Sequence, residues 1–248
     1  MSGPPVTGLP VTTSPVTGSP AISSPVTGSP VTSAGSAKQL AEAITAKFLI
    51  AELAQAERRA RDAKDWALML DCYHPDARIF LSWIDGSPAE FVARSKRMAE
   101  VPGGHAIHQN GVTGVQLNGD RALADTSCAI LMRRLFAGVE CDLTGYCRHR
   151  SRVERRDGLW RLASLVGVYE KNTLVPVVPG TAPALDRQRL AGYRRSYDFQ
   201  CYHREQEGST AFADRPGTDR PDLVDALEAA DRAWLDGADV PLGVGGSA

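Results

Sequence analysis

The stretch "DLTGYCRHRSRVERR", residues 142–156, decides the fold because its middle alternates between two kinds of side chain. Every second residue there is an arginine: Arg148, Arg150 and Arg152. Alternate strand residues point to opposite faces, and burying three unpaired guanidinium groups would cost too much free energy. The other row, with Cys147, His149 and Ser151, should therefore face inward. Such small or polar side chains favour a cavity wall over a solid aliphatic core.

Similar strands flank this one. We expect strands near residues 105–117, 121–135, 140–155 and 159–170. The turns "NGD", "FAG" and "RRDG" between them are too short for a parallel crossover, so consecutive strands should pair antiparallel. In the strand before the arginine row, Thr126, Cys128 and Met132 share the parity that excludes Asp125 and Arg133, so they too should face the interior.

The chain before these strands is mostly helical. Lys38 to about Arg61 reads as a long amphipathic helix with apolar residues at helical spacing: Leu40, Ile44, Phe48, Leu49 and Leu53. A second short helix follows in "DAKDWALMLDCY", and "HPDARIFLSW" then alternates as a strand.

A third helix is predicted from about residue 88 to residue 100. Ser87 is a good N-cap, Pro88 suits the first helical position, and Glu90 completes a capping box. Helices followed by an antiparallel meander predict an α+β domain in which helices cover one face of a curved sheet.

The two ends of the chain differ from this domain. Residues 1–37 contain no charged side chain and repeat "PVTG" from Pro5, Pro15 and Pro25, which predicts a disordered tail. The domain itself should span residues 38–175. Residues 176–238 read as a helical extension that could fold over the mouth of the domain, and residues 239–248 as a second disordered tail.

Composition excludes several classes of function. A net charge of −1 argues against a nucleic-acid-binding surface, and no apolar run approaches the length of a membrane span. Five cysteines without a CxxC pair indicate reduced thiols and a cytoplasmic protein. We found no phosphate loop, dinucleotide fingerprint or serine elbow, and no local spacing for a zinc site, so we expect neither cofactor nor metal.

The segment "HAIHQNGV", residues 105–112, carries two histidines three positions apart. On a strand, His105 and His108 point to opposite faces, so one metal held by both is not expected. Asn110 shares the parity of His108.

The order of elements and several short motifs resemble the SnoaL-like branch of the nuclear transport factor 2 superfamily, in particular the scytalone dehydratases. The motifs are "RDAKDW", "HPDARI", "SPAEFVARS", "HAIHQNG" and "RRDGLWRLASL", and the resemblance covers about residues 40–172. It implies a cone-shaped barrel, in which a strongly bent sheet wraps the long helix around a deep pocket. It also implies a cofactor-independent fold used for dehydration, isomerisation, cyclisation, epoxide opening or plain binding.

The resemblance also implies site residues. Asp62 matches the family's helix-end carboxylate and His108 its catalytic histidine, while His149 and Ser151 fall at the dehydratases' serine and asparagine positions.

The chain departs from the dehydratase pattern at three positions. Arg61 and Leu81 replace two tyrosines, and Met132 replaces a second histidine. The tyrosine pair that activates water in the dehydratases is therefore missing.

The leading hypothesis is a cofactor-free dehydratase, cyclase or isomerase acting on a small, largely apolar carbonyl compound, such as an intermediate of natural-product biosynthesis. His108 would be general base and then acid, and Asp62 would orient it and raise its pKa. The other candidate site residues are the catalytic His149 and the substrate-binding Ser151, Asn110, Trp83, Met132 and Leu81.

Other interpretations stay open. Asp62 could be a solvated helix-end charge, and His108 or His149 a hydrogen-bonded core histidine. The chain could also be a ligand-binding or assembly module without chemistry, or an epoxide hydrolase. Family members often dimerise through the convex face of the sheet, so a homodimer with a small-molecule substrate is expected.

Overall fold

The sheet is the centre of the fold. The computed structural model describes residues 36–101, 105–209 and 211–243. Its six strands are β1 (Tyr73–Leu81), β2 (Ile84–Gly86), β3 (Ala106–Asn118), β4 (Arg121–Phe136), β5 (Val139–Arg156) and β6 (Leu159–Pro176). They pair in the order β2-β1-β6-β5-β4-β3, and β1–β6 is the parallel pair. The predicted antiparallel meander is therefore β3 to β6.

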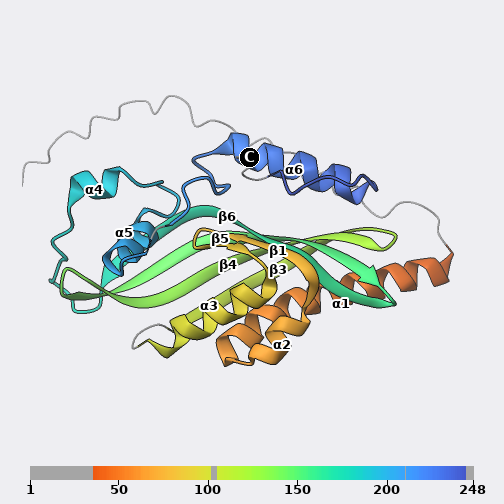
Figure 1. The fold of residues 1–248 in the computed structure, drawn as a ribbon, viewed down its shortest axis with the longest axis horizontal. Coiled ribbons are helices and arrows are strands. Elements are labelled where there is room, and N and C mark those ends of the chain that lie inside the picture. Colours follow the sequence, from red (N-terminus) through yellow and green to blue (C-terminus); the bar gives the residue numbers. More distant parts are fainter. Residues whose placement is uncertain (1–35, 102–104, 210, 244–248) are drawn as a thin grey trace, which may run out of the picture. The chain divides into compact units, whose positions relative to one another are not determined.

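Helices cover both faces of this curved sheet (Figure 1). The helices are α1 (Ala37–Ala63), α2 (Trp66–Asp71), α3 (Pro88–Glu100), α4 (Arg187–Ala191), α5 (Asp198–Gln206) and α6 (Pro221–Leu235). The first three lie on one face, whereas α6 lies on the other. The predicted α+β class, with a mostly antiparallel curved sheet, N-terminal helices and a C-terminal helical extension, is confirmed.

Helix α3 begins and ends where the sequence predicts. Ser87 Oγ accepts a hydrogen bond from the Glu90 N–H at 3.3 Å, and Glu90 Oε2 accepts one from the Ser87 N–H at 2.8 Å. Pro88 occupies the first helical position. The capping box thus satisfies backbone donors that the helix leaves unpaired.

Helix α1 forms as predicted, but four of the five residues of its expected apolar face are exposed. The exposed fractions are 46% for Leu40, 58% for Ile44, 64% for Phe48 and 49% for Leu49. Burial begins at Ile50. Figure 1 shows the first turns of α1 running past the strands, so only the second half of the helix has a sheet to pack against.

The second half of α1 covers the free edge of β3. Gln55 Nε2 donates to the Gly111 carbonyl at 3.0 Å and to Thr113 Oγ1 at 3.1 Å, while Gln55 Oε1 accepts from Asn110 Nδ2 at 3.0 Å. An uncovered edge strand would offer unpaired backbone groups to other chains. These contacts also fix the register between α1 and β3, which sets the geometry of the site.

The arginine row of β5 points away from this interior, as its parity predicts. Cys147, His149 and Ser151 are buried on the inner face. On the outer face, Arg150 and Arg152 reach Asp231 of α6 at 3.2 and 3.0 Å. The arginines therefore meet acidic partners within their own chain, on the face where the resemblance implies a dimer contact.

The C-terminal extension is divided between the two faces. Helix α5 contributes Gln200, His203 and Arg204 to the lining of a cavity, whereas α6 lies on the outer face of the sheet. Residues 239–243 are not the free tail that we expected, because Arg152 donates to the carbonyls of Val240 and Pro241 at 2.7 and 2.9 Å.

Other predictions fall on parts that the structure does not describe. The predicted tail 1–37 lies outside the described residues except for Ser36 and Ala37, and residues 244–248 also lie outside them. Within residues 36–101, 105–209 and 211–243, no helix combines the length and apolar composition that crossing a membrane requires.

Candidate active site

Asp62 and His108 form a closely bonded pair. Asp62 Oδ1 lies 2.6 Å from His108 Nδ1, and Asp62 Oδ2 accepts the backbone N–H of His108, also at 2.6 Å. The carboxylate thus holds both the ring and the strand that carries it. With Nδ1 donating to the carboxylate, Nε2 is the nitrogen left for a substrate.

The end of α1 places this carboxylate. Lys64 adopts the left-handed conformation, with φ 61°, and its N–H donates to the carbonyls of Ala60 and Arg61, which ends the helix. Asp62 stands in the last turn, beside the edge of β3 where His108 lies. Because β3 is an edge strand, the His108 N–H faces α1 rather than a neighbouring strand.

Burial controls the protonation of the pair. The His108 side chain is 4% exposed, and burial lowers its pKa to about 4, against the opposing effect of Asp62 and helped by the charges of Arg61 and Arg58. Asp62 raises the pKa of His108, as we expected, but desolvation of the buried ring outweighs that effect. Burial raises the pKa of Asp62, but the hydrogen bonds from His108 bring it below its ordinary value. At neutral pH the histidine is therefore neutral and the aspartate charged.

His108 lies on the wall of a cavity of about 540 Å³. Trp83 and Met132, predicted to bind substrate, line it too. Apolar wall residues include Met98, Val101, Ile130 and Leu143. Leu81, by contrast, is 4% exposed and packs in the hydrophobic core beneath α1 and α3, so it does not line the cavity.

The other predicted site residues lie deeper. His149, Ser151 and Asn110 line a separate space of about 10 Å³, together with Glu57 and Arg58. The His149 ring is 6.3 Å from that of His108, centre to centre. The Asn110 side-chain N–H already donates to Gln55, so the structure brings these residues near the dyad but not to the wall of the larger cavity.

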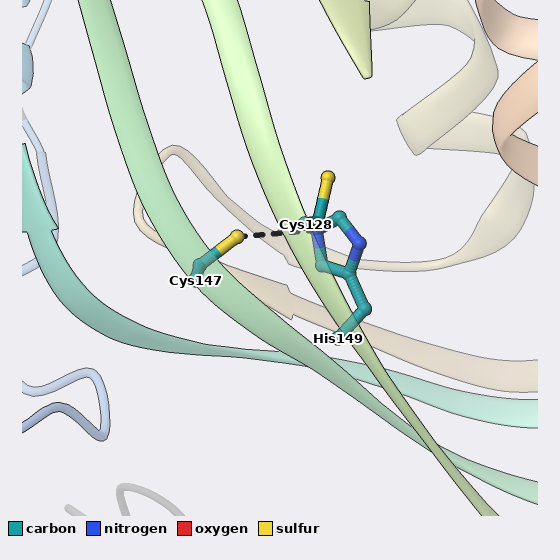
Figure 2. Close-up of side chains that lie close together, drawn as sticks. All are labelled: Cys128, Cys147 and His149. Atoms are coloured by element: carbon teal, nitrogen blue, oxygen red, sulfur yellow. Dashed lines mark hydrogen bonds between the residues drawn. The ribbon is translucent and has the colours of Figure 1, made fainter. Parts of the chain in front are cut away.

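His149 instead contacts two cysteines (Figure 2). Its Nε2 lies 3.8 Å from Cys147 Sγ, and Cys147 pairs directly with Cys128 across β4 and β5. One ligand atom from each of the three lies within 4.8 Å of the others, and all three residues are buried. Among the described residues this is the set that offers three donors to a metal ion. Local spacing could not reveal it, since Cys128 comes from a different strand.

The sequence reasoning missed most of the charge around the cavity. Five arginines line it: Arg61, Arg94, Arg97, Arg134 and Arg204. Arg94 and Arg97 sit one turn apart on α3, a helix that was predicted only for its fold, and Arg204 comes from α5. His203 and Glu207 of the same segment also line the cavity. The only signal in the sequence was this charged face on α5, and nothing local shows that it meets α3.

The part of the chain that holds the Asp62–His108 pair is similar to a known family of domains. The model of the SnoaL-like domain family matches residues 42–166, about half of the chain and all of the Asp62–His108 pair. The chain belongs to the SnoaL-like family.

Relatives of this SnoaL-like chain occur among fungal proteins. A PEP2-like protein of Fusarium vanettenii is 28% identical over 201 residues, covering 77% of this chain and 86% of its own length. Pea pathogenicity protein 2 of the same fungus is 28% identical over 202 residues, with the same coverage. Since 77% exceeds the part matched by the family model, the similarity includes residues outside 42–166.

Solved structures share the fold. The type 3 hexachlorocyclohexane dehydrochlorinase LinA of Novosphingobium barchaimii superposes with a TM-score of 0.50 at 16% identity, covering 58% of this chain and 99% of that one. This likeness extends to the fold of the SnoaL-like domain and not to the C-terminal extension as a whole.

Proposed function

We propose that this SnoaL-like chain is a cofactor-independent lyase or isomerase, acting as a dehydratase, cyclase or double-bond isomerase on a carbonyl compound. The observation that carries the proposal is the pair of 2.6 Å contacts between Asp62 and His108, with the histidine on the wall of a cavity. An imidazole held in this way presents one tautomer and one nitrogen to a substrate.

The proton would move as follows. His108 Nε2 removes a proton from the carbon next to the carbonyl group, and the electron pair of the broken C–H bond forms an enolate. The imidazolium, stabilised by Asp62, then returns the proton to a β-hydroxyl group, which leaves as water, or to another carbon. The first outcome is dehydration and the second isomerisation.

Arg61 is placed to assist the enolate. Its Nη1 lies 4.0 Å from Asp62 Oδ1, it lines the same cavity, and its buried Nε has no hydrogen-bond partner in the described part of the chain. A fixed cation beside a developing oxyanion lowers the barrier to proton removal. Arg61 would thus supply electrostatic stabilisation at the place where the dehydratases carry a tyrosine.

The epoxide-hydrolase interpretation has less support. It requires an acid and a carboxylate nucleophile or base in one pocket. The carboxylate on the lining of the described cavity is Glu207, and Asp62 is engaged by His108.

Hydrogen–deuterium exchange tests the proposal without knowledge of the natural substrate. We expect the protein to accelerate exchange of the acidic C–H protons of 2-tetralone in heavy water, followed by proton NMR. His108→Ala should lower the enzymatic exchange rate by about 10²–10⁴-fold, because general base catalysis is lost. His105→Ala, at an exposed histidine three residues away, is the matched control and should keep the full rate.

Two outcomes would contradict the proposal. One is exchange in His108→Ala at the rate of the unchanged protein. The other is binding of 2-tetralone without any acceleration of exchange, which would favour a ligand-binding module.

A further inference from the structure

The cavity beside the dyad has an unusual charge for a chain that is nearly neutral. Five arginines and one glutamate line it, while the whole chain has a net charge of −1. Charges of one sign that line a cavity with low-dielectric walls attract ligands of the opposite sign. The cavity therefore carries an excess of positive charge that the chain as a whole does not have.

In the part of the chain that the structure describes, Arg204 lacks the carboxylate partner that usually accompanies a buried cation. Within the described residues, no carboxylate oxygen lies within 4.0 Å of the guanidinium groups of Arg94, Arg97 or Arg204. Burial lowers the pKa of Arg204, and it lowers that of Arg61 to about 10. An anion in the cavity would offset the cost of holding these cations away from water.

Arg204 also has a flat apolar neighbour. Its guanidinium carbon lies 5.5 Å from the centre of the Trp83 ring, in cation–π geometry. Trp83 in turn is one of several apolar residues of the wall. A ligand that matches both features has an apolar, ring-sized body and an anionic group.

We infer that the cavity takes an organic acid, with the carboxylate held by Arg204 and the apolar body lying between Trp83 and the dyad. The inference rests on the proposed function only in treating the same cavity as the substrate site. It corrects the expectation of a largely apolar carbonyl substrate by adding a negative charge. An arginine fork matches a carboxylate with two parallel hydrogen bonds.

A matched pair of probes tests the charge. 2-Naphthoate and 2-naphthamide have nearly the same shape and differ in charge, and their binding can be measured by isothermal titration calorimetry on the full chain. We expect naphthoate to bind at least about tenfold more tightly, since hydrogen bonds to charged groups contribute about 1.5–3 kcal/mol. Equal affinity, or binding of neither probe, overturns the inference.

Variants locate the effect. Arg204→Gln should remove most of the preference for naphthoate and leave naphthamide affinity unchanged, whereas Arg204→Lys should keep part of it. Arg195→Gln, at an 88% exposed arginine of the same segment, removes the same charge outside the cavity and should keep the preference. A loss of affinity for both probes in Arg204→Gln would mean that Arg204 only supports packing, contrary to the inference.

Failure of the organic-acid inference can be distinguished from failure of the proposed function. His108→Ala should keep the preference for naphthoate over naphthamide, because it leaves Arg204 in place, although it fails to exchange 2-tetralone protons. Failure of the chemistry therefore leaves the anion site standing, and failure of the anion site leaves the general base standing.

A second inference comes from the cluster of Cys128, Cys147 and His149, which lies outside the cavity. Thiolate and imidazole ligands around a tetrahedral zinc ion stand about 3.5–3.8 Å apart, and Cys147 Sγ is 3.8 Å from His149 Nε2. Two cysteines and one histidine whose ligand atoms lie within 4.8 Å of one another form a donor set that zinc binds, with each cysteine ligating as the thiolate.

The other ring nitrogen of His149, Nδ1, favours the tautomer that leaves Nε2 available to a metal ion. Its Nδ1 is buried without a hydrogen-bond partner among the described residues, as is Asn110 Oδ1, and both residues line the space of about 10 Å³. A space of this size holds about one water molecule, which would accept from Nδ1–H and donate to Asn110. Nε2 would then be free to act as a ligand, as in many histidine–metal sites.

We propose that Cys128, Cys147 and His149 bind one zinc ion, with the fourth position taken by a small ligand such as water. Two thiolates would balance the charge of the ion, so that the buried site is neutral. Local spacing had predicted no metal, but these ligands come together only through the pairing of β4 with β5.

Cobalt titration tests the site directly. The chelator-treated, reduced protein should bind about one Co²⁺ per chain, with thiolate-to-cobalt charge-transfer absorption in the near ultraviolet and tetrahedral d–d bands in the visible, and Zn²⁺ should abolish both. Cys128→Ser should lose these bands. Cys201→Ser, at a buried cysteine of the same apolar cluster that is not in the ligand set, should retain them.

The proposal fails if the unchanged protein shows no such bands. It also fails if Cys201→Ser and Cys128→Ser lose them equally. Because the unchanged protein already gives a decisive spectrum, a variant that does not fold cannot leave the question open.

Discussion

The two faces of the sheet use arginine in opposite ways. On the outer face, Arg150 and Arg152 share Asp231, and Arg150 also meets Glu228 at 3.1 Å. The Trp234 ring lies 5.3 Å from the Arg152 guanidinium. These contacts attach α6 to the sheet and leave little hydrogen-bonding capacity for anything else.

On the inner face, Arg61 and Arg204 have fewer carboxylate partners. Arg61 has one carboxylate at 4.0 Å, and Arg204 has the Trp83 ring. A charge that is already matched within the chain stabilises the fold, whereas a charge that is not matched is available to a ligand. Pairing with a carboxylate, rather than burial alone, therefore distinguishes structural arginines from arginines of the site.

The largest expected effect comes from breaking the matched set. Asp231→Ala should lower the free energy of unfolding by about 3–5 kcal/mol, because it leaves two arginines on the sheet without their shared partner. Burial raises the pKa of Asp231, so the intact set is itself only modestly favourable, and the cost arises from removing one member. Urea unfolding followed by circular dichroism measures the change.

Asp225→Ala is the control for this experiment, since Asp225 is an exposed carboxylate on the same helix. It should change the free energy of unfolding by no more than about 0.5 kcal/mol. Equal losses in both variants would mean that α6 is sensitive to any lost charge and that pairing is not the cause.

A second prediction concerns the pH dependence of proton exchange by His108 on the inner face. The pKa of His108 is lowered to about 4, so the neutral base persists as pH falls through 6.5 and is lost only below about 4. The exchange rate of 2-tetralone should therefore be flat on the acid side down to about pH 4 and then fall tenfold per unit. Circular dichroism at each pH checks that the fold persists. An acid limb centred near pH 6.5 would show that the ring is not desolvated as described.

The smallest expected effect is the stability change on removing a cavity arginine. Arg204→Met should leave the free energy of unfolding within about 1 kcal/mol of the unchanged value, because the lost cation–π contact is offset by relief of a buried charge. Urea unfolding again measures it. A loss of stability as large as that of Asp231→Ala would show that Arg204 is a structural arginine like those of the outer face.

Local rules predicted the local features of this chain well. The capping box placed the start of α3, because a Ser–Pro–x–Glu sequence acts within one helical turn. The parity of the β5 arginines oriented the inner row, since the cost of burying unpaired cations is large compared with other terms. Neither argument needs knowledge of the rest of the fold.

Features that depend on distant segments could not be predicted in this way. The apolar spacing at Leu40, Ile44 and Phe48 predicted a buried face, but burial depends on where the sheet ends. The Asp62–His108 contact came from family resemblance, because 46 residues separate the pair. The arginines of α3 and α5 meet only through the folding of the C-terminal extension, which lies beyond the family's own domain.

The contacts between α6 and the outer face of the sheet determine where this chain can be truncated. The family match ends at residue 166, inside β6 and well before Asp231, Val240 and Pro241, which Arg152 engages. Truncation at the homology boundary would cut a central strand and expose a bare cationic surface. We therefore expect deletions that stop before residue 241 to remove partners of Arg152 together with any other role of the removed segment.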